Sequence, residues 1–298
     1  MGTFDYHEAF SRNIGWVTEA EQATLRRSRV AIGGLGGVGG VHLLTLARLG
    51  VGRFSIADFD VFEIANFNRQ VGATMATLKS SKIDVMASHV RSINPEVDLS
   101  TYPGGIQAEC VDAFLEDVDV YVDGLDFFAF SARRLTFAAC ARKGIPVVTA
   151  APLGLGCAMV TFGSGGMPFE QYFGWDDCDE LEMSIRFLVG LSPAMLQRGY
   201  VADEERINLA ERRGPSSVAA CQLCAGVAGI EVLKLLLGRG GVRFAPWASQ
   251  FDAYRMRLVR TWRPFGYRNP LQRLTIMLVK AQLERMARRA PSGIRHEP

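Results

Sequence analysis

Short apolar runs alternate with amphipathic stretches along the first half of the chain. Residues 28–34 (SRVAIGG) form an apolar run that ends in glycines, and residues 41–50 place apolar side chains at helical spacing. The alternation continues through predicted strands at 54–60, 97–103, 118–126, 145–151 and 153–163 and predicted helices at 80–96 and 132–144. This pattern predicts an α/β fold, with a Rossmann-like, mostly parallel sheet and helices on both faces.

The rhythm changes in the second half. Residues 164–215 combine Gly, Pro and acidic side chains with short helical patches, which is typical of a long crossover loop. Three patterns follow, namely an apolar helix at 221–238, a strand at 250–262 and a basic amphipathic helix at 271–289. We therefore expect one domain over residues 1–270, which ends in an antiparallel extension, and then a basic C-terminal helix and tail over 271–298.

The composition is that of an ordinary globular protein. Of its 298 residues, 48% are hydrophobic and 21% are charged, which suffices for one large core or two modest ones. Lys and Arg (33) nearly balance Asp and Glu (31), so charge alone gives no indication of a nucleic-acid partner. The longest uncharged run (144–169) is broken by Gly and Pro, and the first residues lack the apolar segment of a signal peptide. These features predict a cytoplasmic protein without a membrane partner.

A glycine-rich turn follows the first predicted strand. Gly34-x-Gly36-x-x-Gly39 has the spacing that lets the backbone approach a phosphate at the N-terminus of the next helix. Asp58 stands at the end of the second predicted strand, where a carboxylate can bind both ribose hydroxyls. Any nucleotide with phosphates can use this geometry, so NAD and ATP fit equally well at this point.

The segment DFDVFEIANFNRQ (58–70) separates the two nucleotides. It places two Asp, two Asn and Arg69 where a dehydrogenase would begin its next helix. Lys82 follows near the start of a predicted helix, and Asp126 follows the fourth predicted strand. Arg and Lys can neutralise a triphosphate, and Asp can hold Mg²⁺. Nucleotidyl or phosphoryl transfer needs these groups, whereas hydride transfer needs none of them.

In order and spacing, SRN (11–13), GLGGVG (34–39), DFDVFEIANFNRQ, Lys82 and DGLD (123–126) resemble the adenylylating core shared by ubiquitin-activating enzymes and the bacterial ThiF and MoeB proteins. The resemblance covers most of the chain. It implies a homodimer that uses ATP and Mg²⁺ to adenylylate the C-terminal carboxylate of a small ubiquitin-like carrier protein or a peptide. Pyrophosphate would leave, and an acyl-adenylate would remain.

The resemblance also implies roles for individual residues. Asp58 would bind the ribose, Asp126 would hold Mg²⁺ near the α-phosphate, and Arg12 would reach the γ-phosphate from the other subunit. The implied ATP-binding residues are Gly34, Gly36, Gly37, Gly39, Asp58, Asp60, Asn66, Asn68, Arg69, Lys79, Lys82 and Asp126. The implied catalytic residues are Arg12, Arg69, Lys82 and Asp126.

The sequence departs from the family pattern in three places. Many relatives bind zinc through two CxxC pairs, but the only such pair here is Cys221-x-x-Cys224, so we predict no zinc site. Cys178 is the crossover-loop candidate to carry a thioester, although the acids beside it would weaken its thiolate. The stretch LKSSK (78–82) replaces the turn common before the family lysine, so Lys79 could share or replace the role of Lys82.

Three alternatives to this activity stay open. The activated carboxylate could belong to a tRNA or to a small molecule, which the arginines at 255–263 and the basic RMARR segment (285–289) would support. A scaffold that binds ATP or a partner without turnover would fit the altered lysine turn. A dehydrogenase fits least well, because nothing resembles a hydride-transfer base. We interpret His42, on the first predicted helix, as a packed core histidine.

Overall fold

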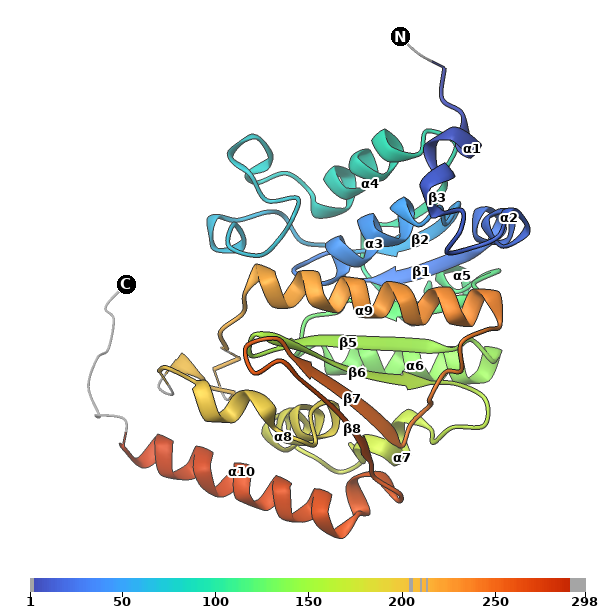
Figure 1. Ribbon diagram of the computed structural model, residues 1–298. Helices are drawn as coiled ribbons and strands as arrows, with labels where there is room; N and C mark the ends of the chain where they lie inside the picture. The colour runs from blue at the N-terminus through green and yellow to red at the C-terminus, as the bar shows by residue number, and fades with distance from the viewer. Residues whose placement is uncertain (1–2, 204–205, 210, 213, 290–298) are drawn as a thin grey trace.

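The computed structural model describes residues 3–203, 206–209, 211–212 and 214–289. Within these residues, eight strands form one sheet in the order β3-β2-β1-β4-β5-β6-β7-β8 (Figure 1). The strands are β1 (Arg29–Gly33), β2 (Arg53–Ala57), β3 (Asp98–Tyr102), β4 (Val120–Asp123), β5 (Val147–Leu153), β6 (Gly156–Phe162), β7 (Trp247–Asp252) and β8 (Arg257–Trp262). Strands β1 to β5 pair in parallel, and β6 to β8 are antiparallel. The predicted parallel sheet with an antiparallel extension is confirmed.

Helices cover both faces of the sheet, as predicted. The α-helices are α1 (Tyr6–Ala9), α2 (Glu19–Arg27), α3 (Gly39–Arg48), α4 (Lys82–Ile93), α5 (Val111–Phe114), α6 (Phe130–Lys143), α7 (Phe169–Phe173), α8 (Glu180–Leu191), α9 (Val218–Leu237) and α10 (Pro270–Arg289). In β1, Val30 and Ile32 join a core with α3, α4 and α9, whereas Ala31 joins a second core with α5, α6 and α7. Successive side chains of a strand point to opposite faces, so the two cores lie on opposite sides of the sheet.

The strand order changes direction between β1 and β4. From β1 the chain continues to β2 and β3 on one side, and from β4 it continues to β5 on the other. Loops that leave two such strands diverge and create a crevice outside their carboxyl ends. Gly34 follows β1 and Gly124 follows β4, so the glycine turn lies at this crevice.

The strand predicted over residues 250–262 is wrong in one respect. The structure has a hairpin here, in which β7 and β8 are joined by residues 253–256. The turn contains no Gly, Pro, Asn or Asp, and its positive backbone angle (φ 49°) is adopted by Met256. Asp252, just before these residues, accepts a hydrogen bond from the backbone N–H of Arg255 (2.9 Å). A single Asp within an apolar strand pattern is a weaker sign of a hairpin than Asn-Gly or Asp-Gly, so the pattern of side chains does not separate the two strands.

The crossover segment is more regular than its composition suggests. Helix α8 lies within it and packs against α10, with Ile185 and Val189 of α8 in contact with Ile276 and Val279 of α10. Figure 1 shows the two helices on the β6–β8 side of the molecule, far from α3 and α4. The C-terminal helix therefore packs against the crossover segment as well as against the short 3-10 helix that precedes it (Gly266–Arg268).

Helix α9 is the one helix among the described residues that is long and apolar enough to span a membrane. It lies along β5 and β6 and also contacts α3. Its side chains Cys224, Ala228 and Val232 are buried in the core. This packing is typical of the core helix of a globular domain.

Candidate active site

A cavity of about 480 Å³ lies at the carboxyl ends of the parallel strands. It brings together most of the residues predicted to bind a nucleotide. Those that line it are Gly34, Gly36, Gly37, Asp58, Asp60, Arg69, Lys82 and Asp126. They come from the segments that follow β1, β2 and β4 and from the first turn of α4, which meet only in the folded chain.

The glycine turn is held against the loop after β4. Gly34 has a positive backbone angle (φ 80°), and a Cβ atom there would lie 2.4 Å from the carbonyl oxygen of Gly124. A Cβ atom on Gly39 would lie 1.8 Å from the carbonyl oxygen of Gly34. Gly39 does not line the cavity, so it permits close packing of α3 rather than access to a ligand.

The N-terminus of α3 faces this cavity. Its N-cap residue, Val38, lines the cavity and makes no side-chain capping hydrogen bond. The first N–H groups of a helix lack partners within the helix and carry partial positive charge. Gly36 and Gly37 beside them have no side chains to block approach. The turn and the helix end therefore form a cradle suited to phosphate groups.

Two carboxylates and a lysine form the adjacent wall. Asp58 accepts hydrogen bonds from the backbone N–H of Leu35 (2.6 Å) and of Asp60 (2.8 Å), and burial raises its pKa. The ammonium of Lys82 lies 2.9 Å from a carboxylate oxygen of Asp60, and its side chain is only 8% exposed. Asp60 thus holds Lys82 in place at the cavity wall.

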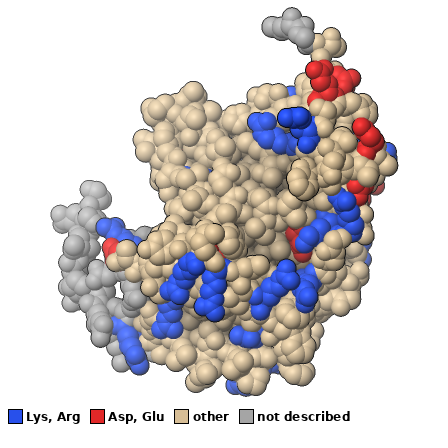
Figure 2. All heavy atoms as spheres, in the orientation of Figure 1, with Lys and Arg blue, Asp and Glu red and all other residues tan. Residues whose placement is uncertain are grey.

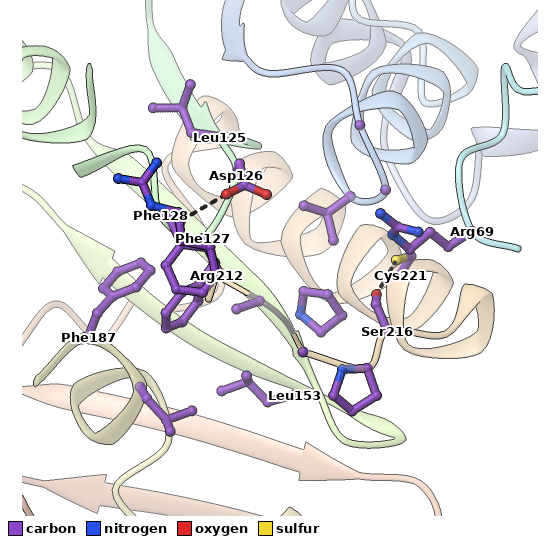
Figure 3. A pocket seen from close by; sticks show the side chains of 18 of the residues that line it. Arg69, Leu125, Asp126, Phe127, Phe128, Leu153, Phe187, Arg212, Ser216 and Cys221 are labelled. Atoms are coloured by element: carbon purple, nitrogen blue, oxygen red, sulfur yellow. Dashed lines mark hydrogen bonds between the residues drawn. The ribbon is translucent and has the colours of Figure 1, made fainter. Parts of the chain in front are cut away.

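Arg69 and Asp126 lie on opposite sides of the cavity (Figure 3). One Nη of Arg69 donates to the carbonyl oxygen of Ala65 (3.0 Å) and to Oδ1 of Asn68 (2.8 Å). One carboxylate oxygen of Asp126 accepts from the backbone N–H of Phe128 (3.0 Å). Asp126 is exposed, so its carboxylate remains accessible to a ligand.

Arg133, on α6, was not singled out by the sequence. It donates from Nε to a carboxylate oxygen of Asp123 (2.8 Å), and neither side chain is more than 2% exposed. Its Nη groups donate to the carbonyl oxygens of Leu125 (3.0 Å), Asp126 (2.9 Å) and Phe127 (3.1 Å). This one side chain therefore fixes the whole loop that presents Asp126. The DGLD motif (123–126) is the only sequence feature near Arg133 that indicates a site, because sequence spacing does not distinguish a buried arginine from an exposed one.

Several predicted site residues lie outside the cavity. Asn66 caps a short turn by accepting from the backbone N–H of Glu63 (2.9 Å). Asn68 donates to the carbonyl oxygen of Ser216 (3.0 Å), so it ties the Arg69 segment to the residues before α9. Lys79 is exposed and pairs with Glu63 at 3.3 Å. The idea that Lys79 shares or replaces the role of Lys82 is therefore not supported, because Lys82 alone of the two reaches the cavity wall.

Arg12 and Cys178 also lie outside the cavity of this chain. Arg12 is exposed on a short 3-10 helix (Ser11–Asn13). Its predicted contact is with another subunit, so that role stays a prediction. The thiol of Cys178 donates to the carbonyl oxygen of Gly174 (3.4 Å), and burial raises its pKa. A thiol so placed is poorly suited to carry an acyl group made in the cavity.

No group of three or more His, Cys, Asp or Glu side chains among the described residues could hold a metal ion. Of the CxxC pair, both cysteines are buried, and Cys221 lines the cavity beside Arg69. Asp123 is engaged by Arg133 and by the hydroxyl of Thr149 (2.7 Å). Asp126 is then the accessible carboxylate that could hold Mg²⁺ together with a nucleotide, since Mg²⁺ commonly uses one or two carboxylates plus phosphates.

Comparison with known proteins agrees with this geometry. Residues 10–274 match the ThiF family. The chain belongs to this family. The resemblance seen in the sequence is thereby confirmed.

Relatives of this ThiF-family chain differ in what they do. This chain is 32% identical to the tRNA threonylcarbamoyladenosine dehydratase of Bacillus subtilis (strain 168) over 141 aligned residues. The alignment covers 47% of this chain and 55% of that protein. The chain is 31% identical to the adenylyltransferase and sulfurtransferase MOCS3 of Anopheles gambiae over 147 aligned residues. That alignment covers 49% of this chain and 33% of that protein. The chain thus spans about half of the first relative and a third of the second.

The fold is shared with solved structures. The structure of E. coli MccB with ATP superposes with a TM-score of 0.60 at 17% identity, over 84% of this chain and 67% of that chain. At this identity the likeness establishes the fold alone.

Proposed function

We propose that this ThiF-family protein uses ATP to adenylylate a carboxylate. The observation that carries the proposal is the placement of Arg69, Lys82 and Asp126 around one cavity beside an uncapped helix N-terminus. Cations on one side and an accessible carboxylate on the other suit a polyphosphate and its Mg²⁺. Hydride transfer would use neither.

The chemistry follows from these positions. The carboxylate oxygen of the substrate attacks the α-phosphorus of ATP, so an acyl–oxygen–phosphorus bond forms as the bond to the bridging β-phosphate oxygen breaks. Pyrophosphate leaves with negative charge, which Arg69 and Lys82 stabilise. Asp126 would hold Mg²⁺, which screens the phosphates so that an anionic nucleophile can approach. Asp58 would bind the ribose, and the glycine turn would position the phosphates.

The substrate class is suggested by the relatives. We take it to be the C-terminal carboxylate of a peptide or of a small ubiquitin-like carrier protein. One relative is an adenylyltransferase and sulfurtransferase, and MccB, which shares the fold, was solved with the MccA peptide. We also propose a cytoplasmic homodimer in which Arg12 of each subunit serves the cavity of the other.

ATP–pyrophosphate exchange in the presence of the carboxylate partner tests the activity. The double variant Arg69→Ala, Asp126→Ala should lose exchange, while Lys79→Ala, which removes a lysine outside the cavity, should keep it. Normal exchange in the double variant would overturn the proposal. The dimer has its own test: mixing the inactive Arg12→Ala and Asp126→Ala variants should restore part of the exchange, and no restoration would refute sharing of the site.

The edge strand β8 favours a second candidate function, the activation of a carboxylate on a tRNA. Arg255, Arg257 and Arg260, on or beside β8, are exposed, and they form no ion pair with any residue that the structure describes. Tyr254 and Trp262 lie exposed beside them. Figure 2 shows Lys and Arg side chains gathered on the half of the face where Figure 1 places β7, β8 and α10. Basic and aromatic side chains together suit RNA, so the activated carboxylate could be borne by a tRNA.

Titration of tRNA binding against salt decides this candidate. Binding that weakens steeply with salt, and weakens further in Arg257→Ala, Arg260→Ala, would support it. Binding that is absent or insensitive to salt would remove it.

A further inference from the structure

The cavity has two chemically different ends. The charged end is formed by the glycine turn, Arg69 and Lys82. Beyond Asp126, the walls are apolar and include Phe127 and Phe187. Figure 3 shows Phe187 across the cavity from Arg69, with Asp126 and the Phe127 and Phe128 rings on the same side as Phe187.

Three distant segments build the apolar end. Leu153 comes from the end of β5, Phe187 from α8, and Val279 and Leu283 from α10. Leu153 and Leu283 are only partly buried, so they present apolar surface that a bound molecule could cover. Phe187 is fixed from behind, because the guanidinium of Arg133 lies 4.6 Å from its ring centroid.

Polar groups at this end are largely engaged already. Arg212 donates to both carboxylate oxygens of Glu180, at 2.6 and 2.7 Å. The side chain of Gln197 accepts from Gln250 (2.8 Å) and donates to Ser192 (3.3 Å). Two polar side chains of this end have no side-chain hydrogen bond within the described residues: Arg198, which is exposed, and Gln282 on α10, which is partly buried. Within the described residues, the inner wall therefore offers one neutral amide, that of Gln282, and otherwise little to a charged or strongly polar group.

We propose that the activated carboxylate carries a large apolar side chain, of the size of leucine or phenylalanine, on the carbon next to the carboxyl group. This inference rests on the proposed adenylylation and narrows its substrate class: of the two proposed substrates it selects a peptide with an apolar terminal residue over a carrier protein that ends in glycine. With the carboxylate at the α-phosphate, on the Asp126 side of the cavity, the neighbouring substituent faces Leu153, Phe187 and Leu283. A glycine terminus would leave the partly exposed Leu153 and Leu283 in contact with water, whereas an apolar substituent would cover them and rest against the buried Phe187.

The position of the ribose supports this orientation. Asp58, the predicted ribose ligand, follows β2, whereas Leu153 ends β5, on the other side of β1 and β4 in the sheet. A nucleotide that spans from Asp58 to Asp126 therefore leaves the β5, α8 and α10 end free for the acyl group. The cavity volume, about 480 Å³, also lies within the range of sites for small ligands.

Non-reacting mimics of the acyl-adenylate test the proposal without knowledge of the natural partner. We would measure the binding of N-acetylglycyl and N-acetylleucyl sulfamoyladenosine, together with AMP, by isothermal titration calorimetry. The leucyl analogue should bind at least about tenfold more tightly than the glycyl analogue, which is the typical effect of filling an apolar pocket.

Variants of α10 and β5 assign the preference to this surface. Leu283→Ala should reduce the leucyl preference several-fold and leave AMP binding unchanged. Leu278→Ala is the matched control, because Leu278 lies on the same helix, is 52% exposed and does not line the cavity. Leu153→Ala, on the sheet itself, gives a second route should the helix variant fail to fold, and it should reduce the preference in the same way.

Each outcome decides the matter. Equal or tighter binding of the glycyl analogue would overturn the inference and leave adenylylation standing. Loss of AMP affinity in Leu283→Ala equal to the loss of leucyl affinity would show that the apolar end holds the adenine, which also overturns it. If ATP and both analogues fail to bind, the proposed function itself falls, and the inference falls with it.

Discussion

Replacing Arg133 with methionine should damage both stability and activity. Methionine keeps much of the arginine stem volume but removes the guanidinium. Asp123 would then be a buried carboxylate whose remaining donors are the hydroxyl of Thr149 (2.7 Å) and the backbone N–H of Leu125 (3.2 Å). The carbonyl oxygens that follow β4 would also lose their donors.

The magnitude follows from the burial of the pair. Removing one partner of a buried ion pair leaves an uncompensated charge and typically costs about 3–5 kcal/mol in the free energy of unfolding. For a chain of this size, that loss corresponds to a fall of roughly 10 °C in the melting temperature. Because the same arginine fixes the Asp126 loop, we expect ATP–pyrophosphate exchange to fall by about 100-fold even in the folded fraction.

Urea unfolding and exchange assays measure the two effects separately. Arg134→Met is the matched control, since Arg134 is the next residue on α6, is 39% exposed and pairs with Glu170 and Asp176 near the surface. That exposed pairing should be worth about 1 kcal/mol or less. The double variant Asp123→Asn, Arg133→Met should regain part of the stability, because no buried charge remains, but not the exchange activity.

Two results would refute this reasoning. One is an Arg133→Met protein whose unfolding free energy lies within about 1 kcal/mol of the unchanged protein, because the ion pair would then contribute no more than a surface pair. The other is a double variant no more stable than the single one, because the loss would then come from the carbonyl groups or the packing rather than from the charge on Asp123.

Three further predictions concern single positions. Lys82→Met should weaken ATP binding by tenfold or more, as expected for a charge-assisted hydrogen bond, whereas calorimetry of Lys79→Met should show little change. Gly34→Ala should destabilise the fold by more than about 1 kcal/mol, because Gly34 has a positive φ and lies against Gly124. The control Gly226→Ala, in open space on α9, should stabilise the fold slightly. Thermal melts of the two variants test this difference. Burial lowers the pKa of His42 to about 4 in the folded protein. Between about pH 6.5 and 4, the unfolded chain therefore binds a proton at His42 that the folded protein does not bind. The free energy of unfolding should fall by about 3 kcal/mol as the pH falls through that range. His42→Leu should remove this slope in urea titrations at several pH values, and a slope that persists would assign it to other groups.

Much of the fold could be predicted because its signals are local. The strand and helix periods, the glycine turn and the carboxyl-end position of Asp58 all depend on residues close in sequence. The hairpin at Met256 was not predicted because its turn is held by one Asp side chain, that of Asp252 to the backbone N–H of Arg255, and contains none of the Gly or Asn residues that mark a short hairpin. Only short helical patches were predicted where the 12-residue helix α8 lies, because its surroundings are rich in Gly, Pro and acidic side chains. Its apolar face is explained by its packing against α10.

The charged end of the site was predictable for the same reason, whereas the apolar end was not. Arg69, Lys82 and Asp126 stand in short motifs whose chemistry is visible in the residue types. Phe187 and Leu283 are apolar residues on helices, and nothing in their spacing separates a cavity wall from an ordinary core position. Their role depends on how the crossover segment and α10 fold back over the sheet, which is information carried by the whole chain.

The division of the cavity between distant segments has a consequence for how such a protein can be changed. The groups that would handle the nucleotide lie before residue 127, and most of the apolar walls come from later segments that include α8 and α10. Selectivity for the acyl group could therefore be redesigned by grafting or recombining the later segments alone. A library restricted to the wall positions of α8, α10 and the end of β5 would vary what is activated while keeping the means of activation intact.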